Sequence, residues 1–340
     1  MLFLVLAAHA YETDQVTSRL VPLADAAAVA DAELDRLLAE AVRRTNEATG
    51  CGKPVRATRA RLATEINRAT SPATVVAGRE GLAAIGHGLY AAWLETAPEV
   101  ARRTFRDRDD IYGDLTPRDS FVLGWAGVCS TVNLGGVLLG TDKTDHFLDQ
   151  GYDYFLRSRE GRNDARAIRW GTRTELSAYG LLTSNAFSWA DLYANWQGYT
   201  FYKTLLEAGS AFQRDEEGCV AQTRPWRWAE WLDDAADEAI NPPVYTPDVG
   251  HAVRLRFQEH RSAVCAEYAA WGPAVAARRV EIAARERAHV TDQAPPRVDE
   301  WGLDELCAPE IEAARVPARP APARGAPVRG ASAEGVPVPR

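Results

Sequence analysis

The sequence predicts an all-α protein, mainly a helical bundle-like fold, with one small β-hairpin near residues 131–139 and a disordered C-terminal tail. Three observations predict this architecture: long stretches whose apolar residues recur with the helical period, a glycine-punctuated apolar stretch in mid-chain, and a proline-rich end. The composition, 46% hydrophobic and 25% charged over 340 residues, is that of an ordinary globular protein.

Charge and hydropathy exclude two classes of partner. The net charge is −8 and the basic residues are not clustered, so the sequence predicts no nucleic-acid binding. Beyond the N-terminal run, no stretch approaches the ~18 consecutive apolar residues that a membrane span needs, so we expect no transmembrane segment.

The N-terminus indicates export. Residues 2–8 form an apolar run, and Ala8-His9-Ala10 is a small-x-small cleavage site, so residues 1–10 are typical of a secretory signal. The run is short and no positive residue precedes it, which leaves a buried first strand as the alternative. We therefore expect a periplasmic or secreted protein with a single helical domain over residues 11–314.

The first half of the chain contains three predicted helices and the hairpin. Residues 24–49 have the strongest helical period, with Gly50 as the stop, and a second helix covers residues 58–69. Residues 90–105 also look helical, and residues 106–117 read as a charged loop. Gly135-Gly136 between two short apolar runs predicts the hairpin, with a buried loop as the alternative.

Helices dominate the rest of the chain. Residues 142–158 form one predicted helix, and two capping boxes open the next two. These are Thr172-x-x-Glu175, which opens residues 172–182, and Ser188-x-x-Asp191, which opens residues 188–208. Three further predicted helices cover residues 225–240, 248–269 and 274–290. Residues 315–340 contain six prolines and no aromatic residue, so they are expected to be a disordered Pro/Arg-rich tail.

Three tryptophans and a run of acids lie in the predicted helix over 225–240. Trp228 and Trp231, with Trp226 close by, are the residue type that stacks on sugars, but their spacing with Leu232 and Ala235 fits a core stripe. The acids on the opposite face are expected to be solvated, with a cation site as the alternative; they are Glu230, Asp233, Asp234, Asp237 and Glu238.

The five cysteines do not form a CxxC metal or redox motif. In an oxidising compartment we expect one or two disulfides, and the odd number leaves a thiol that is free or pairs between chains. The sequence leaves the pairing open among Cys51, Cys129, Cys219, Cys265 and Cys307.

The densest polar segment is residues 141–151. Asp142, His146 and Gln150 are four residues apart and share a helix face, and Lys143 neighbours His146. A carboxylate beside an imidazole orients it and raises its basicity, which suits a general base or a metal ligand. The alternative is structural, with Asp142 a helix cap. A divalent metal is compatible with these residues, although the sequence requires none.

Two further carboxylates are candidates for catalysis. Glu175 and Asp191 have the residue type of an acid–base pair, although their capping-box positions explain both without catalysis. On the helix that Asp191 opens, Asn195 and Tyr199 continue a polar stripe, and Gly198 leaves room for a close helix crossing. We therefore expect residues 141–151 and 188–202 to face each other, with His146 close to Asp191 or Asn195.

Three motifs resemble a family of exported bacterial proteins of unassigned function. They are AYETDQ at residues 10–15, GxDKxxHFxxQG at residues 140–151 and ADLxANxxGYxFY at residues 190–202. The resemblance covers the N-terminus and roughly residues 112–245, and it implies export but no particular activity. Asp142-Lys143-x-x-His146-Phe147 is also similar to the motif of the VanZ-like membrane proteins; since the sequence predicts none of their transmembrane helices, that likeness is confined to the motif.

Two functions remain open on the sequence. The first is an envelope hydrolase in which His146 is a base or metal ligand, with Asp142, Lys143, Glu175 and Asp191 as catalytic residues. Gln150, Asn195 and Tyr199 would then contact the substrate. The second is a non-enzymatic envelope protein that binds a polymer or small molecule, or acts as a scaffold, and whose polar clusters are structural. A cleft open to solvent favours the enzyme and a sealed network favours the second function; the oligomeric state is left open.

Overall fold

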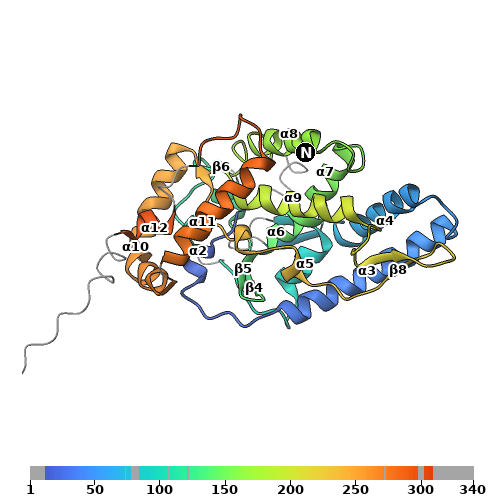
Figure 1. Cartoon of the computed structure of the whole chain (residues 1–340). Helices are drawn as coiled ribbons and strands as arrows, with labels where there is room; N and C mark the ends of the chain where they lie inside the picture. The colour runs from blue at the N-terminus through green and yellow to red at the C-terminus, as the bar shows by residue number, and fades with distance from the viewer. Residues whose placement is uncertain are drawn as a thin grey trace, which may run out of the picture.

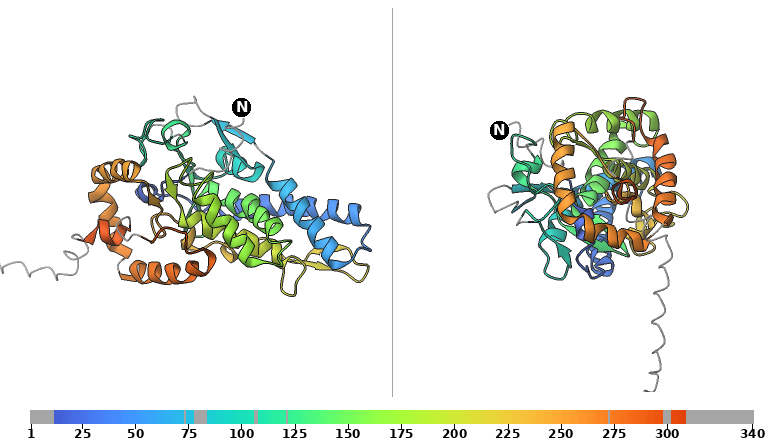
Figure 2. Two further views of the ribbon diagram at one scale, coloured as in Figure 1. Left: turned by 90° about the horizontal axis from the view of Figure 1, so that it is seen from above. Right: turned by 90° about the vertical axis from the view of Figure 1, so that its left-hand side faces the viewer.

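The computed structural model describes residues 12–72, 74–77, 84–105, 108–120, 122–271, 273–297 and 302–308. Within these residues the protein is mostly helical, as expected (Figure 1). Helix α9 (Trp189–Thr204) runs through the middle of the molecule. The paired helices α3 (Ala27–Thr49) and α4 (Val55–Thr70) lie at one end, and α10 (Pro247–Trp271) and α11 (Pro273–Glu286) at the other (Figure 2).

The remaining helical elements are short. They are α2 (Gln15–Ser18), α5 (Leu89–Thr96), the π-turn η2 (Val122–Ala126), α6 (Thr141–Asp145), the π-turn η3 (His146–Gln150), α7 (Gly151–Arg157), α8 (Asp164–Glu175), the 3-10 turns η4 (Trp228–Glu230), η5 (Asp234–Ala236) and η6 (Arg287–His289), and α12 (Leu303–Leu306).

Small antiparallel sheets accompany the helices, more of them than the sequence predicted. The expected hairpin is present as β4 (Thr131–Leu134) and β5 (Val137–Gly140), with β3 (Arg102–Arg103) beside β4. Gly135 and Gly136 turn it with φ of +68° and +94°, which favours glycine. The other pairs are β1 (Thr74–Ala77) with β2 (Ala84–His87), β6 (Ala186–Phe187) with β9 (Val244–Tyr245), and β7 (Phe212–Arg214) with β8 (Val220–Gln222).

The predicted helix over residues 142–158 forms, but it is not a regular α-helix. It is continuous from α6 through η3 to α7, and the backbone N–H of Gly151 donates to the carbonyl of His146, five residues back. This π-turn packs against α9 at the level of Gly198. A Cβ on Gly198 would lie 1.9 Å from the carbonyl oxygen of Phe147, so the two helices cross as closely as backbone allows.

Three predicted helices differ from those observed. The helix expected over 90–105 ends at Thr96, two residues before Pro98. The helix expected over 172–182 is wrong, because α8 ends at Glu175 and its N-cap is Asn163, whose side chain accepts from the N–H of Arg166. Thr172 and Glu175 therefore lie in its last turn, and Glu175 has no capping-box role.

The segment 225–240 is also not the helix we expected. It contains two single 3-10 turns, η4 and η5, joined by irregular backbone. Trp226, Trp228, Leu232 and Ala235 are nevertheless buried and Trp231 is half-buried, so the assignment of these residues to the core was right although their helical period was not.

The acidic residues of this segment are paired rather than simply solvated. Asp233 and Asp234 bind Arg278, Asp237 binds Arg19, and Glu230 binds Arg224. Glu238 turns inward, toward Lys143. The expectation of a solvated acidic face was therefore wrong for Asp237 and Glu238, which are buried, whereas Glu230, Asp233 and Asp234 are exposed or partly exposed.

Two disulfides join distant parts of the chain, Cys51 to Cys219 and Cys265 to Cys307. They use four of the five cysteines and leave Cys129 as a free, buried thiol. None of the helices described is long and apolar enough to cross a membrane. The expected signal segment, residues 1–10, and the expected tail, residues 315–340, lie outside the described residues.

Candidate functional site

Five segments meet at a buried polar cluster, which we call the Lys143 network. It consists of Glu12 and Thr13 from the N-terminal segment, Asp142, Lys143 and His146 from α6 and η3, Glu175 at the end of α8, Asp191 and Asn195 from α9, and Glu238 after η5. Two of the contributing segments, residues 141–151 and 188–202, are those expected to face each other, and their close packing confirms that prediction.

Lys143 is the centre of the network. Its Nζ lies 2.8 Å from Asp142 Oδ2, 2.6 Å from Asp191 Oδ1 and 2.5 Å from Glu238 Oε1. The contacts with Asp142 and Glu238 are hydrogen bonds, and the contact with Asp191 is an ion pair. Thr13 Oγ1 donates to the other Asp142 oxygen at 2.7 Å, which fixes that carboxylate from the opposite side.

His146 joins the same network one helical turn later. Its Nδ1 lies 3.0 Å from Asn195 Oδ1 and its Nε2 lies 3.1 Å from Asp191 Oδ2. Both ring nitrogens thus face an oxygen acceptor, which suits the doubly protonated imidazolium. The Asn195 amide donates onward to Tyr154 Oη at 3.4 Å.

The charges of the network are mutually stabilised. Burial alone would lower the pKa of His146, but the Asp191 carboxylate outweighs it and raises that pKa to about 9. In the same way, its three carboxylate neighbours raise the pKa of Lys143 despite burial. Burial alone would raise the pKa of Asp191, but His146 and Lys143 hold it below its usual range. We infer that Lys143 and His146 are cations and that Asp191 is an anion at neutral pH.

The pKa values of the remaining acids are shifted in the opposite direction from that of Asp191. Burial, reinforced by the Asp191 charge, raises the pKa of Glu12 and of Glu175 to about 8 each. Burial also raises the pKa of Glu238 well above its ordinary value. Glu12 accepts from Ser184 Oγ at 2.8 Å, and Glu175 accepts from the N–H of Ser188 at 2.8 Å. Glu12 and Glu175 are therefore held as neutral acids near pH 7.

The network is enclosed. Lys143 is fully buried, and the other residues of the network are at most 4% exposed. A cavity of about 20 Å³ touches it at Thr13 and Glu238, beneath Tyr112 and Tyr245. This space holds about one water molecule. The arrangement can therefore hold buried charges in place, but a substrate does not reach Lys143 or His146 without a rearrangement.

Two of the predicted substrate-binding residues, Gln150 and Tyr199, are not members of the Lys143 network. Gln150 is buried in η3, and Tyr199 donates to Asp164 at 2.5 Å, close to the Lys203 ammonium and away from His146. Asp142, Lys143, His146, Glu175, Asp191 and Asn195 do come together in the network. Sequence reasoning missed Glu12, Thr13 and Glu238 as members.

The missed residues lie in segments that the sequence analysis singled out, but the sequence does not show that these segments lie close to Lys143. Glu12 and Thr13 belong to the AYETDQ segment, which suggested a family resemblance but no role. Glu238 belonged to an acidic run that was assigned to a solvated face. Glu12 and Glu238 are acidic residues without a local partner in the sequence, and only the tertiary structure brings them near Lys143.

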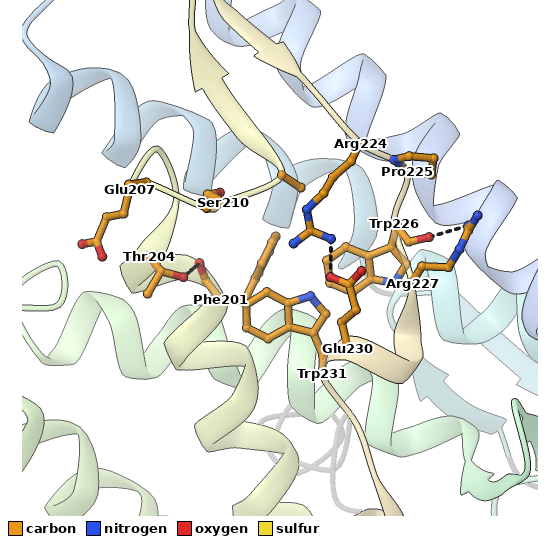
Figure 3. A pocket seen from close by; sticks show the side chains of 13 residues that line it. Phe201, Thr204, Glu207, Ser210, Arg224, Pro225, Trp226, Arg227, Glu230 and Trp231 are labelled. Atoms are coloured by element: carbon orange, nitrogen blue, oxygen red, sulfur yellow. Dashed lines mark hydrogen bonds and ion pairs between the residues drawn. The ribbon is translucent and has the colours of Figure 1, made fainter.

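A separate open pocket, the Trp231 pocket, lies at the other end of α9 (Figure 3). Its volume is about 350 Å³. Trp231 lies at its centre and stacks on Trp226 with an interplanar angle of 8° and ring centroids 5.9 Å apart. Arg224 and Glu230 form an ion pair beside the indole. The other lining residues are Phe201, Thr204, Glu207, Ala208, Gly209, Ser210, Ala211, Pro225 and Arg227.

No protein-family model, curated protein or solved structure matches the chain. The resemblance that the three sequence motifs suggest therefore stays a prediction.

Proposed function

We propose that the protein is a non-enzymatic binding protein of the bacterial cell envelope, which holds a saccharide segment of an envelope polymer in the Trp231 pocket. In this proposal the Lys143 network is a structural lock between α6, α9 and the N-terminal segment. Export rests on the apolar start of the sequence and on the two disulfides, which persist in oxidising compartments.

The single observation that carries the proposal is the contrast in access between the two sites. The Lys143 network has its cations matched by carboxylates, and the cavity that it touches has a volume of about 20 Å³. The Trp231 pocket is open and about 350 Å³ in volume, which is within the range of small-ligand sites. Ligand binding therefore fits the pocket, and structural locking fits the network.

The lining of the pocket favours a neutral ring over an ion. Arg224 pairs with Glu230, so their charges balance inside the pocket. Arg227 lies 3.6 Å from Asp31, and Glu207 lies 3.5 Å from Arg59, so these charges are also balanced. A half-exposed indole offers a flat apolar face, and the flanking charged pair offers donors and acceptors to hydroxyls. A sugar ring has both an apolar face that can stack on the indole and hydroxyl groups that can bond to the charged pair.

Titration calorimetry with neutral glucan and N-acetylglucosamine tetramers tests the proposal. We expect binding of at least one of them, and Trp231→Ala should weaken it about tenfold, in line with the loss of an aromatic stacking contact. Trp125→Ala is the matched control, because this tryptophan is exposed and does not line the pocket. Absence of binding to both tetramers, or an equal loss in both variants, would contradict the proposal.

One observation favours a hydrolase as the second candidate function. Glu12 and Glu175, with pKa values raised to about 8, are carboxylic acids held protonated near neutral pH, as a general acid must be. This function requires the network to open to substrate. Hydrolysis of an envelope polymer that Glu175→Gln abolishes without loss of folding would favour the hydrolase over the lock.

A further inference from the structure

A second buried cluster lies beside the Lys143 network and takes no part in the proposed function. It consists of His87 at the end of β2, Glu95 on α5 and Cys129 between η2 and β4. His87 and Cys129 are fully buried, and the Glu95 side chain is 11% exposed. One donor atom from each residue lies within 4.8 Å of the other two.

The spacing of these atoms is close to that of a tetrahedral metal site. His87 Nε2 lies 3.7 Å from Cys129 Sγ and 3.9 Å from Glu95 Oε1. In a zinc site with bonds of about 2.0 Å to nitrogen and oxygen and about 2.3 Å to sulfur, the corresponding edges are roughly 3.5 Å and 3.3 Å. Shifts of a few tenths of an ångström in the side chains would close the difference.

The other nitrogen of His87 is already oriented. Asp145 Oδ2 lies 2.9 Å from His87 Nδ1, which directs Nε2 toward the cluster. The second oxygen of Asp145 accepts the N–H of Gly88 at 3.0 Å, and a Cβ on Gly88 would lie 2.6 Å from that oxygen. A carboxylate that holds the far nitrogen of a histidine is the usual support of a metal-ligating imidazole.

Hydrogen bonds also fix the Glu95 carboxylate. The N–H and Oγ of Ser130 donate to its two oxygens at 2.8 and 2.6 Å, and Thr141 Oγ1 donates to Oε1 at 2.5 Å. Oε1, the oxygen nearest His87, accepts both the Ser130 N–H and the Thr141 hydroxyl, so a metal ion bound there would take the place of the Thr141 hydrogen bond. The supporting hydrogen bonds hold the carboxylate in place beside the imidazole and the thiol.

We propose that His87 Nε2, Glu95 and Cys129 Sγ bind one Zn²⁺ ion. A set of one nitrogen, one oxygen and one sulfur donor is typical of zinc, whose preference spans all three. Three protein ligands leave a fourth position for water or an external ligand.

Asp142, His146 and Asp191 also bring donor atoms within 4.8 Å of each other. There, however, the Lys143 ammonium already lies against both carboxylates, at 2.8 and 2.6 Å, and takes the place of a cation. The three residues of the His87 cluster include no such ammonium, so a metal ion bound by them would not compete with a lysine. This inference is independent of the saccharide proposal.

Cobalt substitution tests the site on the folded full chain. After removal of metal with a chelator, one equivalent of Co²⁺ should give the intense visible absorption of a tetrahedral site and a near-ultraviolet thiolate-to-cobalt band. Because the other four cysteines are in disulfides, that band would identify Cys129 as the ligand. Binding of one Zn²⁺ should then displace Co²⁺ and remove the absorption.

Variants separate this site from its neighbour. Cys129→Ser should abolish the thiolate band, and Asp145→Asn should weaken zinc binding about 10- to 100-fold. His146→Gln, in the Lys143 network, should leave the band intact. Failure of the wild-type protein to bind Zn²⁺ or Co²⁺, cobalt binding without the thiolate band, or loss of metal in His146→Gln with retention in Cys129→Ser would each overturn the proposal. If Cys129→Ser does not fold, the wild-type cobalt spectrum still decides.

Discussion

The two halves of α9 carry opposite kinds of site. Asp191 and Asn195, in its first half, are buried in a network of charges that leaves room for about one water molecule. Phe201 and Thr204, near its last turn, line an open pocket of about 350 Å³ whose centre is an indole ring. The first half of the helix thus contributes to an enclosed site, and its end contributes to an open one.

The difference shows that the residues with the most reactive side chains are not those that a ligand can reach. Charged and titratable residues attract attention in a sequence, but a sealed charge cluster whose cations are matched by anions is a cohesive unit. A half-exposed aromatic ring flanked by an ion pair carries fewer reactive groups, yet it offers surface to a ligand. If the two halves of α9 differ in this way, substitutions around the first half change stability and substitutions around the second half change binding.

The largest expected effect is on Lys143. Lys143→Met leaves Asp142, Asp191 and Glu238 buried without their shared cation, and loss of one partner of a buried ion pair costs about 3–5 kcal/mol. Urea denaturation should show a loss of this size. Lys203→Met is the control, because Lys203 and its partner Asp164 are 35% and 46% exposed and such pairs contribute about 0–1 kcal/mol. Equal effects of the two substitutions would contradict the lock.

The next effect concerns the helix crossing. Alanine is the better helix former by about 1 kcal/mol, so Gly198→Ala would stabilise an isolated α9. In the protein the added Cβ would meet the Phe147 carbonyl at 1.9 Å, and we expect a loss of about 1–3 kcal/mol instead. Gly52→Ala, whose Cβ would meet nothing nearer than 3.8 Å, should change the free energy of unfolding little. A more stable Gly198→Ala protein would refute the close crossing.

A fall in stability with rising pH is expected from the network. The pKa of Glu175 is raised from its ordinary 4.5 to about 8, so between these values the folded protein binds more protons than the unfolded chain, and stability falls as pH rises. The pKa of His146 is raised from 6.5 to about 9, so its contribution is fully present below pH 6.5 and is lost as pH rises through 9.

The free energy of unfolding at pH 9 should therefore be lower than at pH 5 by at least about 1 kcal/mol, which chemical denaturation at each pH would measure. Glu175→Gln should flatten the part of this fall between pH 4.5 and 8. His146→Gln should flatten the part between pH 6.5 and 9. A stability that rises over this range would contradict the proton assignments.

The smallest effect on stability is expected in the pocket. Arg224 and Glu230 are 40% and 41% exposed, so Glu230→Gln should change the free energy of unfolding by less than about 1 kcal/mol. The same substitution removes a charged acceptor beside Trp231 and should weaken saccharide binding. If Glu230→Gln destabilises the protein as strongly as Lys143→Met, the division between the two halves of α9 fails.

Local signals predicted the regular elements well. The helices near residues 24–49, 58–69, 248–269 and 274–290 formed because their apolar period and stop signals act within a few residues. Gly135-Gly136 likewise marked the hairpin. The segment 225–240 escaped prediction because tertiary partners override its helical period: Asp31 accepts the backbone N–H of Trp228 at 2.9 Å, from a residue far away in the chain.

The candidate site was predicted in part for a similar reason. His146, Asp191 and Asn195 were expected to meet because two helices with polar stripes need mutual partners. Glu175 was misread, since Thr172-x-x-Glu175 has a capping spacing at the wrong end of a helix. Glu12 and Glu238 lie far from Lys143 in sequence, and no local pattern links them to it.

The π-turn at His146–Gln150 sets the angular phase of the helix that carries Lys143. Positions eight residues apart on a regular α-helix diverge by about 80°, so Lys143 and Gly151 would not both point at one neighbouring helix. Here Lys143 contacts Asp191 while Gly151 contacts Gly198, both on α9. The wider turn closed by the Gly151–His146 hydrogen bond absorbs that angular drift. Removal of one residue from this turn would restore regular winding and rotate the lysine by about 100° away from its three anions.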